Sequence, residues 1–173
     1  MQNSEHFKSP YLSSSHRLPD ILAAIQVMGS QRWDSREIKD WVTTLGPEPQ
    51  SALSWEALFT DHPEFFGSTP RSEGGTYYFL RLRRSYERTV DPDDLRELSN
   101  QEIKELKDSG KYAATKLCRK SLAPSQVEAL MKTAIELQVR AAALQDRLRW
   151  WIPVASAVLA FVGATLGSLL KAI

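Results

Sequence analysis

The C-terminal residues 150–170 constrain this chain more than any other part of it. No charged residue occurs from Trp150 to Leu170, and a helix of these 21 residues would be about 30 Å long, the thickness of a bilayer's hydrocarbon core. Trp150 and Trp151 stand at its start, where interfacial aromatic side chains are common. A buried core helix is the alternative, but core helices of this length rarely lack a charge. The run therefore predicts a C-terminal transmembrane helix, with Trp150, Trp151 and Leu170 as membrane-anchor residues and the lipid bilayer as a partner.

The charges on either side of this run predict its orientation. Lys171 follows the run, whereas four basic residues closely precede it: Lys132, Arg140, Arg147 and Arg149. The positive-inside rule then places the N-terminal domain in the cytoplasm of a single-pass, tail-anchored inner-membrane protein. Residues 1–16 lack the apolar segment of a secretory signal, and the single cysteine, Cys118, agrees with a reducing compartment.

Residues 18–90 have the pattern of a small mixed domain, preceded by a disordered N-terminus over residues 1–17. Helices are expected over about 18–29, 34–45 and 52–61, each ended by a glycine or by His62-Pro63. A hairpin then follows, with one strand at Phe65-Phe66, a polar loop over 67–75 and a second strand over 76–83. Three helices followed by a hairpin predict a winged-helix-like domain, in a protein that is mainly α with a small β-hairpin. The alternative is a plain three-helix domain with an appended hairpin.

The second hairpin strand carries most of the candidate interaction residues. Its alternation directs Tyr78, Leu80 and Leu82 to one face. The opposite face and the residues after it are basic and aromatic, and we expect the following side chains to contact a partner: Arg71, Tyr77, Arg81, Arg83, Arg84 and Arg88.

The partner of these arginines is either an acidic protein surface or a nucleic-acid backbone. In a winged helix the third helix enters the major groove, but here it carries Glu56 and Asp61 and no basic residue. Residues 1–90 hold ten basic and eleven acidic residues, whereas phosphate binding needs concentrated positive charge. A protein partner is therefore favoured over nucleic acid.

The C-terminal half is expected to be a polar, basic linker with short helices over 91–123 and one long amphipathic helix over 124–149. Apolar residues recur in this helix with heptad spacing: Val127, Leu130, Ala134, Leu137, Ala141, Leu144 and Leu148. The pattern favours a coiled coil, and so a homo-oligomer, with Leu130, Leu137, Leu144 and Leu148 as oligomerisation residues. Gly163 and Gly167 would support it through close helix packing. The alternative is a helix that packs on its own domain.

Several motifs resemble a group of uncharacterised bacterial single-span membrane proteins with an N-terminal winged-helix-like domain. The resemblance rests on Trp55 followed by His62-Pro63-Glu64-Phe65-Phe66, on residues 80–84 (Leu-Arg-Leu-Arg-Arg), and on residues 147–153 (Arg-Leu-Arg-Trp-Trp-Ile-Pro). It would cover residues 18–170. It implies a bacterial inner-membrane setting and carries no known activity with it.

The sequence contains no recognisable catalytic or metal-binding pattern. No phosphate-binding glycine loop is present, and the three histidines and Cys118 are not at metal-ligand spacings. His62 is expected to cap the helix before it rather than to serve with Glu64 as an acid–base pair. We therefore expect no enzyme and no cofactor. The function predicted is a membrane-anchored protein-interaction module that self-associates through the helix before the span, and the alternative is a membrane-tethered DNA-binding regulator.

Overall fold

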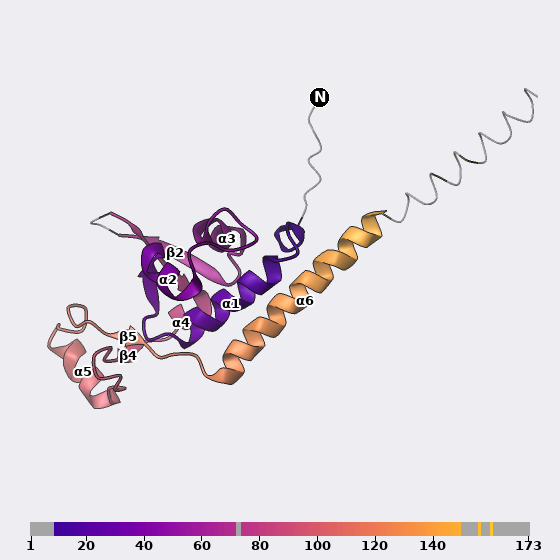
Figure 1. Cartoon of the computed structure of the whole chain (residues 1–173). Coiled ribbons are helices and arrows are strands. Elements are labelled where there is room, and N and C mark those ends of the chain that lie inside the picture. Colours follow the sequence, from indigo (N-terminus) through magenta and orange to yellow (C-terminus); the bar gives the residue numbers. More distant parts are fainter. Residues whose placement is uncertain (1–8, 72–73, 150–155, 157–159, 161–173) are drawn as a thin grey trace, which may run out of the picture.

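The computed structural model describes residues 9–71, 74–149, 156 and 160, and Figure 1 shows the arrangement of its elements. In chain order the elements are η1 (Pro10–Leu12), α1 (Arg17–Ser30), β1 (Ser35–Glu37), α2 (Ile38–Leu45), α3 (Trp55–Asp61), β2 (Phe66–Pro70), β3 (Thr76–Leu80), α4 (Arg81–Arg84), β4 (Arg88–Val90), α5 (Asn100–Asp108), β5 (Cys118–Arg119) and α6 (Pro124–Arg149). We call residues 10–84 the head and residues 88–119 the lobe.

The head has three main helices and a three-stranded antiparallel sheet in the order β1-β3-β2. The first helix and the hairpin lie close to where the sequence predicts them, but residues 35–37 form a strand rather than the start of a helix, and they pair with residues 77–79. The core of the head is apolar and largely aromatic, with the following side chains buried: Ile21, Ile25, Met28, Trp41, Trp55, Leu58, Phe59, Phe66 and Leu80. Burial of these large side chains is the main source of stability of the head.

The N-terminal segment is more ordered than the sequence predicts. Residues 9–17 were expected to be disordered, but η1 forms a short helical turn and Tyr11 is buried. Tyr11 belongs to the same core cluster as Trp41 and Leu58, so its ring contributes the apolar area that orders this segment.

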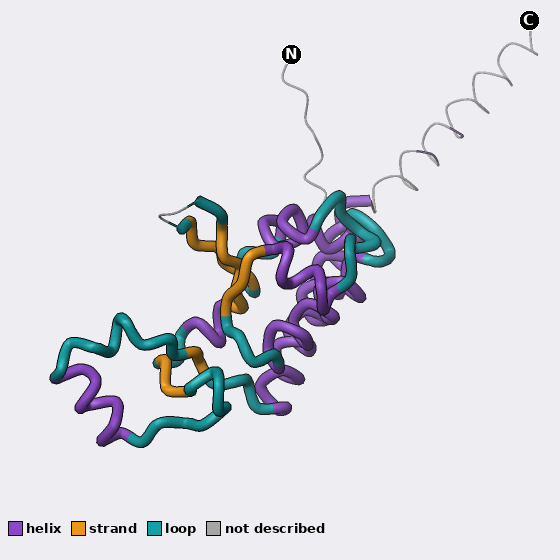
Figure 2. Tube along the Cα trace, turned by 60° about the vertical axis from the view of Figure 1, so that its left-hand side comes forward, coloured by secondary structure: helices purple, strands orange, loops and turns teal. Residues whose placement is uncertain are grey.

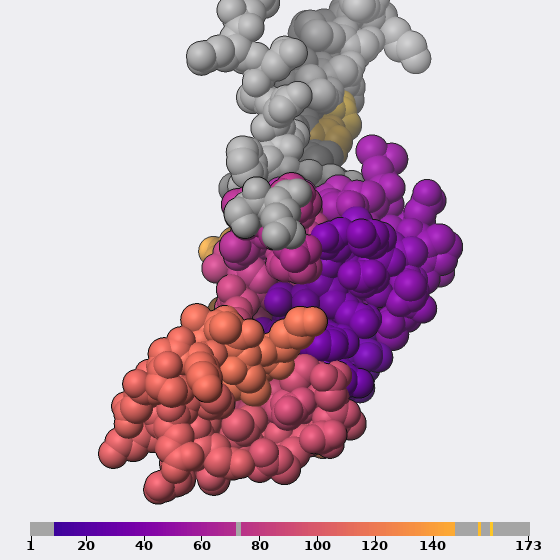
Figure 3. Space-filling model, turned by 90° about the vertical axis from the view of Figure 1, so that its left-hand side faces the viewer, coloured from indigo at the N-terminus to yellow at the C-terminus, as the bar shows by residue number. Residues whose placement is uncertain are grey.

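The lobe replaces most of the expected linker. Strands β4 and β5 pair with each other, and α5 begins with a capping box in which Ser99 and Glu102 exchange hydrogen bonds. Figure 2 shows this unit projecting from one end of the head, with much of its chain in loops, and Figure 3 shows its surface next to that of the head. Ile103, Leu117 and Cys118 are among its few buried apolar residues, so the lobe has a much smaller core than the head.

Helix α6 packs along α1, and its heptad stripe faces the head of its own chain. Val127 and Ala134 are buried, while Leu130, Leu137 and Ala141 are partly buried against the core cluster. The approach is close, because a Cβ on Gly29 of α1 would lie 3.0 Å from Cγ2 of Val127. The heptad stripe is therefore not available to form the expected coiled coil. The structure shows the alternative, in which the helix packs on its own domain. Leu144 is exposed, and the side chain of Leu148 lies outside the described residues.

The predicted membrane anchor requires correction. Within residues 9–71, 74–149, 156 and 160, no helix combines the length and the apolar composition that crossing a bilayer requires. Helix α6 is amphipathic and carries a charged residue on almost every turn, including Glu128, Lys132, Glu136 and Arg140. The fold class with a transmembrane helix, the tail-anchored class and the single-pass inner-membrane location are therefore not supported. The residues on which that prediction rested lie outside the described residues: Trp150, Trp151, Gly163, Gly167 and Leu170.

Candidate functional site

The outer face of the sheet, which points away from the core, carries aromatic rings that are covered in part by basic side chains, with Tyr77 half-buried and Phe79 buried. Tyr78 and Leu80 of β3 face the core, so Tyr77 and Phe79 lie on the opposite face, as the alternation predicts. The ring of Phe79 lies against β2, since a Cβ on Gly67 would approach it to 2.6 Å. Glycine at position 67 therefore permits the close packing of this ring.

Two arginines lie over these rings. The guanidinium carbon of Arg84 is 4.9 Å from the centroid of Phe79, and that of Arg71 is 5.4 Å from the centroid of Tyr77. Both distances are within the range of favourable cation–π contacts. Because Tyr77 and Phe79 are two residues apart on one strand, the two stacking sites are separated by about 7 Å along it. Arg71 and Arg84 remain partly exposed, with 43% and 31% of their side-chain surfaces accessible, and Nη1 of Arg71 lies 3.9 Å from Oε1 of Glu37.

Helix α4 continues this basic surface beyond β3. Arg81 and Arg84 lie three residues apart on one side of α4, and Arg88 is close enough to Arg84 to repel its charge. Arg81 is exposed and donates from Nε to the carbonyl oxygen of Phe66. We call Arg71, Arg81, Arg84 and Arg88 the outer arginine cluster.

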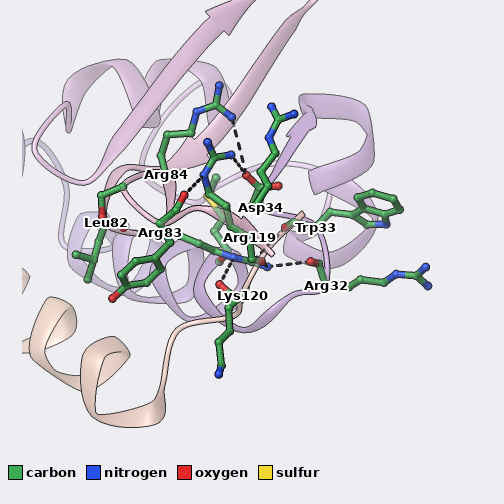
Figure 4. Close-up of polar contacts among 12 residues, drawn as sticks. Arg32, Trp33, Asp34, Leu82, Arg83, Arg84, Arg119 and Lys120 are labelled. Atoms are coloured by element: carbon green, nitrogen blue, oxygen red, sulfur yellow. Dashed lines mark hydrogen bonds and ion pairs between the residues drawn. The ribbon is translucent and has the colours of Figure 1, made fainter. Parts of the chain in front are cut away.

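Arg83 does not belong to this surface. The strand predicted to run to Arg83 ends at Leu80, and the turn of α4 directs Arg83 into the interior, where it is fully buried. Figure 4 shows its guanidinium between two chain segments. Its five N–H groups serve six backbone carbonyl oxygens at 2.5–3.1 Å, with the two hydrogens of Nη1 shared among three of them. The acceptors are the carbonyl oxygens of Met28, Gln31, Arg32, Trp33, Arg119 and Lys120. Arg83 therefore joins the end of α1 to the chain that returns from the lobe, and it is not a contact residue.

Asp34 is the carboxylate that balances the arginines at this junction. Its Oδ2 lies 2.6 Å from Nη1 of Arg119 and 3.9 Å from Nη1 of Arg84, and its side chain is 8% exposed. Figure 4 shows Arg84 and Arg119 converging on it. The sequence predicts only that Asp34 lies at the start of the second helix. Its role at the junction becomes visible only when the sheet register places Ser35 opposite Phe79.

The local electrostatics leave an excess of positive charge. Burial lowers the pKa of Arg84, and repulsion from Arg119 and Arg88 lowers it further, while Asp34 opposes the change. Burial also lowers the pKa of Arg83, with Asp34 again acting in the opposite direction. Arg83 and Arg84 are thus both repelled by Arg119 and both attracted by Asp34, and Arg88 adds to the repulsion at Arg84. A carboxylate from a partner would relieve this repulsion.

A second polar cluster contains His62 and Glu64, which the sequence offers as an alternative pair, and Tyr11, which it does not identify. His62 is fully buried, and its Nδ1 lies 3.1 Å from Oε1 of Glu64, which also accepts a hydrogen bond from the Tyr11 hydroxyl. Burial tends to raise the pKa of Glu64, but the hydrogen bonds from His62 and Tyr11 outweigh it and leave that pKa below its usual value. His62 occupies the C-cap position of α3, and its imidazole pairs with Glu64. This cluster joins η1 to the rest of the head. The imidazole of His62 is fully buried, so a substrate in solution could not reach it.

The described residues offer no obvious place for metal or thiol chemistry. No group of three or more His, Cys, Asp and Glu side chains in this part of the chain has an arrangement that could hold a metal ion. Cys118 is buried, and burial raises the pKa of its thiol. Its neighbours Arg119 and Lys120 therefore do not make it a reactive thiolate.

Comparisons with known proteins find no match for this chain among family models, curated proteins or solved structures. The functional interpretation therefore rests on the chain's own residues. The resemblance to bacterial single-span proteins and the absence of an enzymatic activity stay predictions.

Proposed function

We propose that the head is a protein-interaction module whose outer sheet face binds an acidic segment of a partner protein. The observation that carries the proposal is the outer arginine cluster, with Arg71 and Arg84 stacked on Tyr77 and Phe79 and only partly covered. Arginine and tyrosine are enriched at protein interfaces, where arginine pairs with carboxylates through its planar fork of donors.

The spacing of the stacked arginines favours an extended partner. Side chains two residues apart on a strand are about 7 Å apart, which matches the separation of the Arg71 and Arg84 stacking sites. A segment with acidic residues at every second position would therefore place one carboxylate at each guanidinium. Arg81 and Arg88 extend the positive surface beyond this pair.

DNA binding is the competing function, and the geometry of α3 argues against it. The exposed side of α3 carries Glu56, Thr60 and Asp61, and Asp61 forms an ion pair with Arg17 at 3.2 Å. No lysine or arginine on this helix is available for phosphate contacts, on which DNA affinity depends. The outer arginine cluster alone would have to supply them.

A peptide-binding experiment tests the proposal. The probe is a fluorescein-labelled peptide of alternating glutamate and serine, and the control peptide replaces each glutamate with glutamine. We expect the full-length protein to increase the anisotropy of the glutamate peptide only. The double variant Arg71→Ala/Arg81→Ala should bind about tenfold more weakly, the effect of losing about 1.4 kcal/mol of charge–charge interaction.

The matched control is Lys104→Ala/Lys111→Ala, which removes the same charge from exposed positions in the lobe. It should bind the peptide as the native protein does. Equal weakening by both double variants would show an unspecific charge effect and contradict the proposal. Tighter binding to a duplex DNA at the same salt concentration, lost in the Arg71/Arg81 variant, would favour the DNA-binding alternative.

A further inference from the structure

Helix α6 has a second apolar stripe beside its contact with the head, and Met131 at the start of this stripe is partly buried against the core cluster. It consists of Met131, Ile135, Val139 and Ala142, at spacings of four, four and three residues that keep them on one side of a helix. Ile135 and Val139 are 43% and 60% exposed, whereas Val127 and Ala134 of the inner stripe are buried. We call these four residues the outer stripe. Figure 1 shows α6 along one edge of the head.

The apolar surface continues beside the outer stripe toward α1. A groove of about 480 Å³ lies at the N-terminal half of α6, and Leu122, Val127, Met131 and Ile135 contribute its apolar lining. The groove and the outer stripe share Met131 and Ile135, so a helix docked on the stripe would also cover part of the groove. Contact of this kind would remove the exposed isoleucine and valine from water.

The charges on this side of α6 indicate which partner binds the outer stripe. Lys132 and Asp146 lie seven residues before and seven residues after Val139, on the same side of the helix as the outer stripe. Neither residue forms an ion pair within the part of the chain that the structure describes. If a second α6 lies antiparallel with Val139 opposite Val139, then each Lys132 faces Asp146 of the other copy. A parallel pair would instead bring lysine to lysine and aspartate to aspartate.

We propose that the outer stripe is a homodimer interface, in which two copies of α6 pair antiparallel about a two-fold axis at Val139. Ala142 and Ala143 are small enough to allow close approach of the two helices opposite Ile135. The two Lys132–Asp146 pairs set the register and the direction. The interface is independent of the inner heptad stripe, which is already packed on the head, and of the acidic-partner site on the sheet.

Cysteine crosslinking tests the register. The experiment uses the full-length protein in mild detergent, because the residues after Arg149 are strongly apolar. The Val139→Cys variant should form a disulfide-linked dimer on oxidation. A residue on the two-fold axis lies opposite its own copy, and Cys118 is buried and does not compete. Arg140→Cys is the matched control, since it points about 100° around the helix and should remain monomeric on a denaturing gel. Absence of a Val139→Cys dimer, or equal crosslinking at Arg140→Cys, would overturn the proposed interface.

A charge exchange tests the direction. In sedimentation equilibrium, Lys132→Asp and Asp146→Lys should each weaken the dimer about tenfold, and the double variant should restore its native dissociation constant. A double variant no stronger than the single variants would contradict the antiparallel pairing. A native protein that is monomeric at 100 µM, roughly the upper range for a specific dimer, would refute the dimer itself.

Discussion

Two basic regions lie on opposite sides of α4. One is the interior junction around Arg83, and the other is the outer face of the sheet with Arg84. The two residues are adjacent in the sequence, but Arg83 is fully buried with six carbonyl acceptors, whereas Arg84 is partly exposed and stacks on the ring of Phe79. In the interior every donor is used within the chain, so the guanidinium contributes to stability. On the outer face the charge is only partly balanced, so the guanidinium remains available to a partner.

The largest expected effect comes from Arg83→Met, which keeps the volume of the stem and removes the guanidinium. Six backbone carbonyl oxygens would lose a donor, and buried unsatisfied polar groups are costly. We expect the free energy of unfolding in urea to fall by about 3–5 kcal/mol. Arg83→Lys should recover only a small part, because one ammonium group does not reach acceptors on both chain segments. A loss below about 1 kcal/mol would show that the junction does not depend on Arg83.

Gly67→Ala should have the next largest effect, and it acts on the outer face. The new Cβ would meet the Phe79 ring at 2.6 Å, so the ring must move away from β2 and disturb its contact with Arg84. We expect a loss of about 1–3 kcal/mol in unfolding free energy, as for other overpacked sites. Ser68→Ala, at the exposed neighbouring position, is the control and should change the free energy by less than about 0.5 kcal/mol. Equal stability of the two variants would contradict the packing described for Phe79.

Asp34→Asn connects the two regions, because Asp34 contacts Arg119 at the junction and Arg84 on the outer side. Removal of its charge should reduce the unfolding free energy by about 1–2 kcal/mol, less than for a fully buried pair since Arg84 is partly exposed. The same substitution increases the positive excess, so the affinity for the glutamate peptide should rise. A variant that loses stability and also binds the peptide more weakly would show that the two regions are not electrostatically linked.

The sequence predicts the outer face better than the interior. The period-two pattern of residues 76–80 correctly separates Tyr78 and Leu80 from Tyr77 and Phe79. Extension of that pattern to Arg83 is wrong, because α4 is a single turn and four residues are too few for a helical period to be visible. The acceptors of Arg83 come from segments about 36 and 52 residues away, and no local pattern records such a contact.

The same limit applies to α6 and to the lobe. The heptad spacing of α6 is real, but a stripe that packs on its own head and a stripe that forms a coiled coil have the same periodicity. The lobe has few apolar residues and therefore has the composition of a linker, although Ser99 and Glu102 do signal the start of α5. Which surface a stripe covers depends on contacts distant in sequence, and these come from the structure.

The double variant Arg71→Ala/Arg81→Ala should have the smallest effect on stability, and it tests most directly whether the outer face is the binding surface. Both side chains are exposed, so the double variant should keep its unfolding free energy to within about 1 kcal/mol of the native value. Its affinity for the alternating glutamate–serine peptide should nevertheless fall about tenfold in fluorescence anisotropy. Unchanged affinity in a stable double variant would contradict the claim that the outer face is the binding surface.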